Sequence, residues 1–409
     1  MHNDYVSIAA RVSGHLDLPR LDRAWRRVQA RHAVLLSGFD LGSQQWLPAR
    51  AEPGGLLLFD LSGDRPAGSE ADPSTVLADA LHTPLSVAAG PLARLCVVTE
   101  SETSHLVGLA VEHLVCDGWT VGLLESELWQ AYPNPSERVN LSEPETTRAA
   151  DFRALVIEQH RYLASDSGRS ALDRRCRALQ DVGPLPTLDM PAPAADPLQG
   201  HRPRHVSIAL DEVRFGALRD RGSRFGLSVI GVTLAAILAA TQELTGASRV
   251  GAGMILANRA DPEVRQTVGW LSDEIVATCD CACAPSSEQF LSRFAAGFAD
   301  AVDASRVPSR AVVARMAPEL MGVPGKLPRI VYNPMPSSLR GMFPPPEVQG
   351  LSVTRLTMPE SWAGNEIHVL ASDSRSLVLR MFYKPRAVDP DLMRELRDGV
   401  RDRLGRWAC

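Results

Sequence analysis

The chain has no excess of positive charge, no long hydrophobic run and almost no lysine. Its formal net charge of -5 and its pI of about 6.1 give no reason to expect binding to nucleic acid. All of its basic residues except Lys326 and Lys384 are arginines. The most apolar run, 227–241, is interrupted by polar residues and is shorter than the ~20 residues that a membrane span needs. We therefore expect neither nucleic acid nor membrane among its partners.

A secretory signal and paired cysteines are also missing. Polar residues follow Met1 where a signal peptide would need an apolar core. The seven cysteines are odd in number, which favours a reducing cytoplasm, so we predict a cytoplasmic protein. Cys279, Cys281 and Cys283 alternate at the end of a predicted strand without the paired C-x-x-C spacing of structural zinc sites. We interpret them as small apolar strand residues and expect no metal.

What is present is the composition and size of a globular protein with two parts. The 409 residues are 45% hydrophobic and 22% charged, which is ordinary for a globular chain long enough for two domains. Strand-like and helix-like segments mix in both halves, and 227–243 is predicted to be a buried helix. A stretch rich in Pro, Ala and Asp at 184–200 is the predicted linker. We predict an α/β fold with two lobes, 1–183 and 184–409.

The most informative motif is H-x-x-x-D-G-W-T at 113–120. Residues 105–113 alternate as in a strand, and His113 would continue the row of apolar side chains on one of its faces. Gly118 would then allow a sharp bend into a helix. An imidazole at the buried end of a strand can serve as a general base. The competing interpretations are a hydrogen-bonded core histidine and, for Asp117, a helix cap or a turn residue.

Further segments, in a fixed order along the chain, give this motif a context. They are G-x-L-D at 14–17, R-H-x-x-L-x-x-x-F at 31–39, G-P-L-A-R at 90–94, the motif with the preceding Glu112 at 112–120, D-F at 151–152, N-R at 258–259 and V-G-W-L-S-D-E at 268–274. Together they resemble the condensation domains of nonribosomal peptide synthetases, which belong to the chloramphenicol-acetyltransferase-like acyltransferase superfamily. The resemblance extends over nearly the whole chain.

The resemblance implies an architecture and a catalytic centre. It implies two chloramphenicol-acetyltransferase-like subdomains in a V-shaped pseudo-dimer, with the active site in a tunnel between them. His113 would be catalytic together with Asp117 and Gly118, whose backbone N–H is a candidate oxyanion donor. Arg259 would pair with Asp117. We interpret this pair as a structural support for the His113 turn, not as a proton relay.

Two departures from the family pattern affect the other site residues. Glu112 stands where the family usually has its first His, and strand alternation would place it on the face opposite His113, so we assign it a structural role. Asp273 stands where Asn is usual. The candidate substrate-binding residues are Trp119, Ser272, Asp273 and Asn333. For Ser272 and Asp273 a structural role is an equal alternative, and Asn333 is the weakest candidate because such a residue often only caps a strand end.

The implied reaction moves an acyl or aminoacyl group from a carrier-protein thioester to an amine or a hydroxyl, forming an amide or an ester. No bound cofactor is expected, because the phosphopantetheine arm arrives on an acyl or peptidyl carrier protein. We expect a free-standing monomeric acyltransferase of natural-product or antibiotic biosynthesis, with a carrier protein in trans and a small-molecule amine or alcohol acceptor. The alternatives are a catalytically inactive recruitment platform and an acyltransferase that uses free acyl-coenzyme A.

Overall fold

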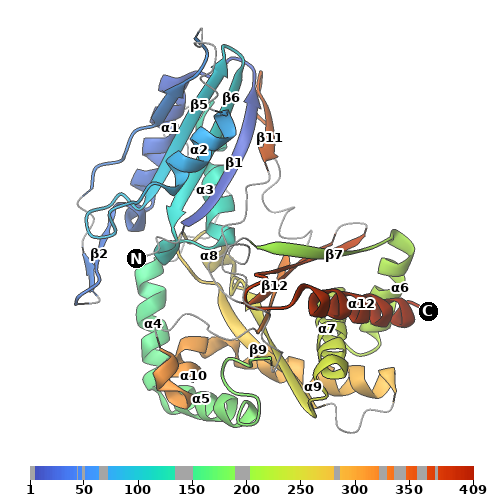
Figure 1. Cartoon of the computed structure of the whole chain (residues 1–409). Helices are drawn as coiled ribbons and strands as arrows, with labels where there is room; N and C mark the ends of the chain where they lie inside the picture. The colour runs from blue at the N-terminus through green and yellow to red at the C-terminus, as the bar shows by residue number, and fades with distance from the viewer. Residues whose placement is uncertain are drawn as a thin grey trace. The chain divides into compact units, whose positions relative to one another are not determined.

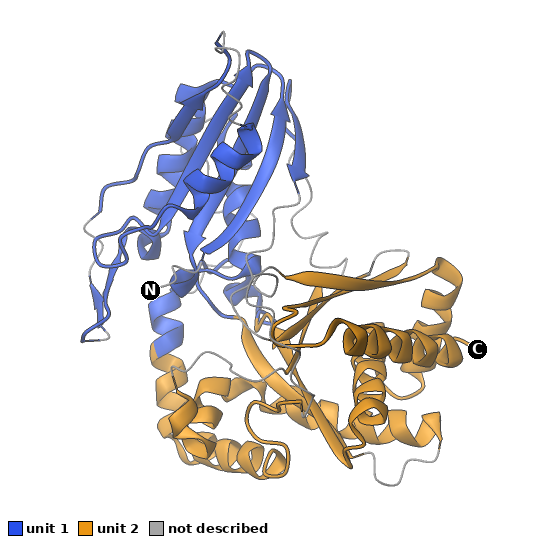
Figure 2. Cartoon of the chain, viewed as in Figure 1, with its two compact units in different colours: residues 1–156, 259–271, 341–360 blue, residues 157–258, 272–340, 361–409 orange. Residues whose placement is uncertain are grey.

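The chain divides into two compact units that are not continuous in sequence (Figure 2). Unit 1 comprises 1–156, 259–271 and 341–360, and unit 2 comprises 157–258, 272–340 and 361–409. This division differs from the predicted lobes, because two segments of the second half belong to unit 1 and the end of the first half belongs to unit 2. The computed structural model describes residues 5–43, 45–47, 51–63, 72–133, 151–188, 203–280, 286–321, 329–335, 347–356, 366–373 and 376–409. Most of the predicted linker lies outside these ranges. Cys281 and Cys283 also lie outside them.

Unit 1 is built on a five-stranded sheet. In spatial order its strands are β11 (Ser352–Leu356), β1 (Tyr5–Ser13), β6 (Ser104–Glu112), β5 (Ala93–Ser101) and β4 (Leu57–Asp60). Neighbouring strands are antiparallel except β4 and β5, which run parallel. A separate hairpin pairs β2 (Gly38–Asp40) with β3 (Gln45–Leu47). Because β11 comes from 341–360, the second half of the chain supplies an edge strand to this sheet.

Helices cover both faces of the unit 1 sheet (Figure 1). Alternation along β6 directs Val107 and Leu109 into the cluster with α1 (Leu18–Arg31) and α3 (Gly118–Ala131). Leu106 and Ala110 point to the other face, where α2 (Pro73–His82) packs. The predicted two-sided strand is therefore confirmed, and α3, which begins within the motif, is held against the sheet.

The strand that leads into the motif ends one residue earlier than predicted. It ends at Glu112, and His113 begins a short 3-10 turn, η2 (His113–Val115). The expectation that Glu112 and His113 lie on opposite faces of one strand is wrong, because the backbone leaves the sheet between them. The period-two pattern of apolar residues runs on into this turn, so periodicity alone does not mark the strand end.

Unit 2 is built on a six-stranded sheet. In spatial order its strands are β7 (Arg204–Leu210), β13 (Leu377–Tyr383), β12 (Ile367–Asp373), β10 (Ile330–Met335), β8 (Arg249–Leu256) and β9 (Asp273–Asp280). Strands β12 and β13 pair antiparallel, from His368 with Phe382 to Asp373 with Leu377. Strand β10 continues through Asn333 and Pro334. Pro334 lacks an N–H but stays in register with Ala371 of β12, while β8 pairs with β10 at Val331 and Tyr332.

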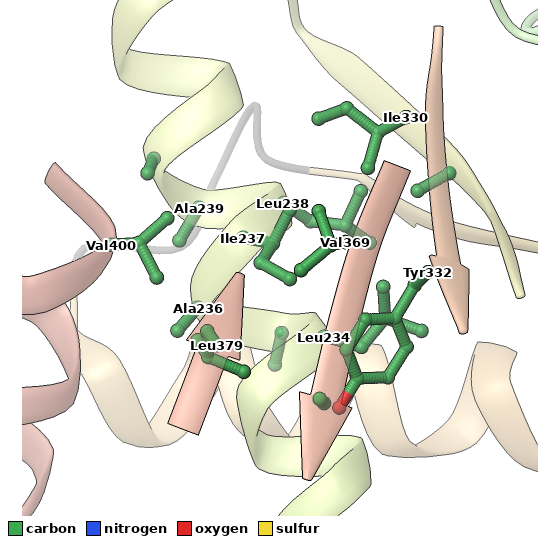
Figure 3. Close-up of a cluster of buried hydrophobic side chains, with 14 of the residues drawn as sticks. Leu234, Ala236, Ile237, Leu238, Ala239, Ile330, Tyr332, Val369, Leu379 and Val400 are labelled. Atoms are coloured by element: carbon green, nitrogen blue, oxygen red, sulfur yellow. The ribbon is translucent and has the colours of Figure 1, made fainter. Parts of the chain in front are cut away.

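The core of unit 2 surrounds α7 (Val229–Thr245), the predicted buried helix. Figure 3 shows Leu234 and Leu238 of this helix among side chains from the sheet and from α12 (Pro390–Trp407). Ser228 caps its start, and Gly246 ends it in the left-handed conformation with φ 67°. Within the described ranges, no helix combines the length and apolarity needed to cross a membrane.

The remaining helices flank these elements. Unit 2 also contains α6 (Glu212–Ser223) and α9 (Ser287–Asp303), while α5 (Asp166–Ala178) and α10 (Ser309–Met316) form a smaller apolar cluster with Val276 of β9. Helix α4 (Phe152–Ala164) begins in the sequence of unit 1 and continues into that of unit 2. The short α8 (Pro262–Arg265) lies in the 259–271 segment of unit 1. The 3-10 turns η1 (Ala33–Leu36), η3 (Ala304–Arg306) and η4 (Pro318–Leu320) complete the described elements.

Candidate active site

A buried ion pair joins the motif to the 259–271 segment. Nη2 of Arg259 lies 3.1 Å from Oδ1 and 3.2 Å from Oδ2 of Asp117. The side chains are 0% and 3% exposed, respectively, and both residues belong to unit 1. The pairing that the family resemblance implied, over a separation of 142 positions, is therefore present.

Arg259 also binds the backbone of its own segment. Its Nη1 donates to the carbonyls of Val264 (3.1 Å) and Thr267 (2.7 Å), and its Nη2 donates to that of Gly269 (2.9 Å). Burial lowers the pKa of the Arg259 guanidinium, and the charge of Asp117 opposes this shift. The backbone of the segment is thus bonded around the Arg259 guanidinium. Asp117 provides the opposite charge.

Asp117 combines the ion pair with the helix-cap role that we held as its alternative. Its Oδ1 accepts from the backbone N–H of Thr120 (2.8 Å), which caps α3. Its Oδ2 accepts from the backbone N–H of Leu271 (3.1 Å). A carboxylate at the N-terminus of a helix is also favoured by the helix dipole. Asp117 therefore connects α3, Arg259 and the far end of the 259–271 segment.

Thr120 is a member of this cluster that the sequence did not reveal. Its buried Oγ1 donates to the Gly269 carbonyl (2.8 Å) and accepts from the Gly269 N–H (3.2 Å) and from Arg259 Nη2 (3.0 Å). One donor and two acceptor positions of the hydroxyl are thereby used. No local pattern indicates a partner 149 positions away, so only the structure assigns Thr120 this role.

His113 lies beside Trp270 of the same segment. Their ring centroids are 4.5 Å apart at an interplanar angle of 62°, an edge-to-face contact. The His113 side chain is partly buried, and its Nδ1 is buried without a hydrogen-bond partner among the described residues. Our alternative interpretation, a hydrogen-bonded core histidine, therefore receives no support at Nδ1. Trp270 is 47% exposed and was not singled out from the sequence.

Gly118 and Trp119 open helix α3. Gly118 is exposed, has no positive φ and is the first helical residue, so the entry into the helix does not require glycine there. A Cβ built on Gly118 would meet no described atom within 4 Å, which leaves open space over this helix start. Trp119 is instead buried, with its Nε1 donating to the Arg265 carbonyl (2.9 Å) and its ring 5.6 Å from the Arg259 guanidinium.

The other candidate residues fall into different surroundings. Asp273 accepts from the N–H (2.8 Å) and the Oγ (2.5 Å) of Ser309 at the start of α10. Ser272 is partly buried before β9, and Asn333 is partly buried on β10. All three belong to unit 2, whereas His113, Asp117, Gly118, Trp119 and Arg259 belong to unit 1. Glu112 is buried at the end of β6, paired in register with Tyr5 of β1.

The cysteine within the motif is not placed as a nucleophile. Burial raises the pKa of the Cys116 thiol well above its usual value, and the charge of Asp117 adds to the shift. A neutral buried thiol attacks an acyl group poorly. Across the described ranges, no three His, Cys, Asp or Glu side chains gather as they would around a metal ion. His113, by contrast, is a partly exposed titratable residue of the motif.

Comparison with known proteins places the fold and the family. The condensation-domain family model matches residues 3–320. The chain is 26% identical over 358 residues to chondramide synthase cmdD of Chondromyces crocatus, covering 85% of this chain but 8% of that protein. The chain thus spans less than a tenth of the length of this relative.

Solved structures with the same fold cover nearly the whole chain. VibH, a nonribosomal-peptide-synthetase condensation enzyme, matches with a TM-score of 0.73 at 15% identity, over 99% of this chain and 92% of its own. The X-domain in complex with OxyB from teicoplanin biosynthesis matches with a TM-score of 0.79 at 17% identity, over 99% and 88%. Because the family model covers more than half of its length, the chain belongs to the condensation-domain family.

Proposed function

We propose that this protein catalyses acyl transfer from a carrier-protein thioester to an amine or a hydroxyl in natural-product biosynthesis. The observation that carries the proposal is the partly exposed His113 imidazole on a turn next to the open start of α3. Family membership supports the reaction class. Condensation-type acyltransferases work without a covalent enzyme intermediate, so one well-placed base is a sufficient chemical group.

In the proposed reaction the acceptor nitrogen or oxygen attacks the thioester carbonyl carbon. Because Nδ1 of His113 is buried, we assign Nε2 as the atom that takes the proton of the attacking group. The new C–N or C–O bond forms, the tetrahedral intermediate collapses, and the C–S bond breaks. The proton held by His113 then passes to the departing phosphopantetheine sulfur. The overall reaction consumes the thioester and the acceptor and releases the acylated product and the free thiol, so it requires no oxidant or metal.

The start of α3 supplies the proposed stabilisation of the oxyanion. Backbone N–H groups at a helix N-terminus point outward and lie at the positive end of the helix dipole. Asp117 occupies the Thr120 N–H, and we assign the Gly118 N–H to the developing oxyanion. The absence of described atoms around a Cβ on Gly118 leaves room for the thioester carbonyl. Because a thioester is already activated, the enzyme mainly has to align the two substrates and stabilise the oxyanion with this donor.

The experiment compares donors and one pair of variants. Purified protein is given small amines and alcohols with acyl-loaded carrier protein added as a separate chain, with free acyl-coenzyme A, or with neither. We expect product from the carrier-bound donor only. His113→Ala should lower kcat by roughly 10²–10⁴-fold, the usual contribution of general acid–base catalysis. His82→Ala, which removes an exposed histidine at the end of α2, is the matched control and should keep full turnover.

A recruitment platform is the second candidate, and Glu112 in place of the family's usual first His is what favours it. The X-domain from teicoplanin biosynthesis, which shares this fold, was solved in complex with OxyB, so one protein of this fold is known with a bound partner. Absence of product with every donor, together with binding to a carrier or partner enzyme that His113→Ala leaves unchanged, would support the platform. Turnover with free acyl-coenzyme A alone would support the third alternative.

A further inference from the structure

We propose that Trp270 is a positioning residue that fixes the orientation of the His113 imidazole. The inference rests on the proposed function, in which His113 is the base. It concerns how that base is held. The two rings make an edge-to-face contact with centroids 4.5 Å apart. Trp270 belongs to the same unit as His113, although 157 positions separate them in the sequence.

The backbone on both sides of Trp270 is bound to the first turn of α3. The N–H and the carbonyl of Gly269 both bond to Thr120 Oγ1, at 3.2 Å and 2.8 Å. On the other side, the N–H of Leu271 donates to Asp117 Oδ2 at 3.1 Å. Trp270 is therefore the single residue between two anchored neighbours. Its ring therefore contacts His113 from a segment that is anchored to the helix start following the His113 turn.

Packing of an aromatic ring against Gly269 limits movement of the segment. A Cβ on Gly269 would lie 2.3 Å from the Phe152 ring, so the aromatic ring already rests against the Gly269 backbone. Phe152 is itself in edge-to-face contact with Trp46, with centroids 6.2 Å apart. A segment bonded at two neighbouring residues and backed by an aromatic ring is a rigid support for the indole.

His113 needs such a support because its hydrogen bonding does not provide one. A catalytic imidazole is commonly oriented by a hydrogen bond at its second ring nitrogen. Here Nδ1 is buried and has no partner among the described residues. The carboxylate oxygens of Asp117 accept from Arg259, Thr120 and Leu271. The indole of Trp270 is the group seen against the ring, and an edge-to-face contact restricts rotation of an aromatic ring.

The proposal also gives the buried cluster a purpose beyond stability. Arg259, Asp117 and Thr120 fix the segment at Gly269 and Leu271, and through it they fix the ring that contacts the base. Trp270 is 47% exposed, so shortening it empties a site that is already half open to solvent and should leave the fold intact. The effect of a Trp270 variant should accordingly fall on catalysis.

The test uses Trp270→Ala and the conservative Trp270→Phe in the full chain. In Trp270→Ala, kcat with the carrier-bound donor should fall by about 10–100-fold, while KM for each substrate changes by less than about threefold. Trp270→Phe should recover most of the turnover because a phenyl ring keeps an aromatic edge or face against His113. Full kcat in Trp270→Ala, a change confined to KM, or no recovery in Trp270→Phe would overturn the proposal.

A second readout does not depend on turnover. In protein with isotope-labelled histidine, the ring signals of His113, assigned by their loss in His113→Ala, should shift in Trp270→Ala because the indole ring current is gone. They should shift less in Trp270→Phe. Unchanged His113 signals in Trp270→Ala would contradict the contact itself. If the wild-type protein lacks turnover while the signals shift as expected, the proposed function fails and the support of His113 by Trp270 stands.

Discussion

Each unit contains an arginine paired with carboxylate inside the protein, but the two arginines are held differently. Arg259 in unit 1 bonds to one carboxylate, one hydroxyl and three backbone carbonyls, and its side chain is 0% exposed. Arg329 in unit 2 is 12% exposed and lies between two carboxylates, Glu274 and Glu366. The first arginine organises a loop, and the second neutralises acidic side chains.

The pKa directions of the two guanidinium groups express this contrast. Burial lowers the pKa of Arg259, and the single charge of Asp117 does not make up for it. Burial acts the same way on Arg329, but the charges of Glu274 and Glu366 outweigh it and raise the pKa. The Arg259 charge is less fully balanced by carboxylates than that of Arg329, but its many hydrogen bonds hold the surrounding backbone in one defined structure. In unit 1 that structure is the surroundings of His113.

The largest expected effect comes from removing each arginine in turn. Arg259→Met should destabilise the protein by roughly 3–5 kcal/mol, because it leaves the Asp117 charge buried with its partner gone. Arg329→Met should cost roughly 1.5–3 kcal/mol, the scale of hydrogen bonds to a charged group, since its site is less deeply buried. Urea unfolding gives the total, and hydrogen exchange on peptides from α3 and β9 locates the loss. Equal losses of unfolding free energy in the two variants would contradict this difference between the two arginines.

A smaller effect is expected from a methyl group added at two glycines of unit 1. Gly269→Ala should cost about 1–3 kcal/mol, as overpacking does, because the new Cβ would lie 2.3 Å from the Phe152 ring. Gly118→Ala should change stability by less than about 0.5 kcal/mol, since its Cβ meets no described atom.

The two glycines should also differ in how they affect turnover. Gly118→Ala should lower kcat while the unfolding midpoint stays at the wild-type value, because the methyl group enters the space assigned to the thioester carbonyl. Gly269→Ala should lower both together. Full turnover in Gly118→Ala would remove the start of α3 from the proposed reaction.

The local features of this molecule could be predicted from its sequence. Alternation gave the two faces of β6, the apolar run gave the buried α7, and motif order gave the pairing of Asp117 with Arg259. The first two features follow from patterns that repeat over short spans of sequence, and the third follows from the known pattern of the family. The end of β6 was misplaced by one residue, because an apolar row continues into a turn that has no glycine or proline to mark it.

The parts that could not be predicted depend on irregular backbone far away in the sequence. The 259–271 segment joins unit 1 through carbonyl and N–H groups of Val264, Thr267, Gly269 and Leu271, which every residue type possesses. No side-chain pattern marks which carbonyl will accept from Arg259. The pairing of β11 with β1 could not be predicted for the same reason, since backbone hydrogen bonds between strands do not depend on which side chains the strands carry. Thr120 and Trp270 acquire their roles only through that segment.

The central claim is that Asp117 supports the His113 turn and takes no part in moving the proton. It is tested most directly by the free energy of unfolding of Asp117→Asn, measured together with single-turnover acyl transfer. The substitution leaves the Arg259 charge buried without its counter-ion, so we predict a loss of roughly 3–5 kcal/mol and a poorly folded protein. An Asp117→Asn protein with wild-type stability and no acyl transfer would contradict the claim and would place Asp117 in the chemistry.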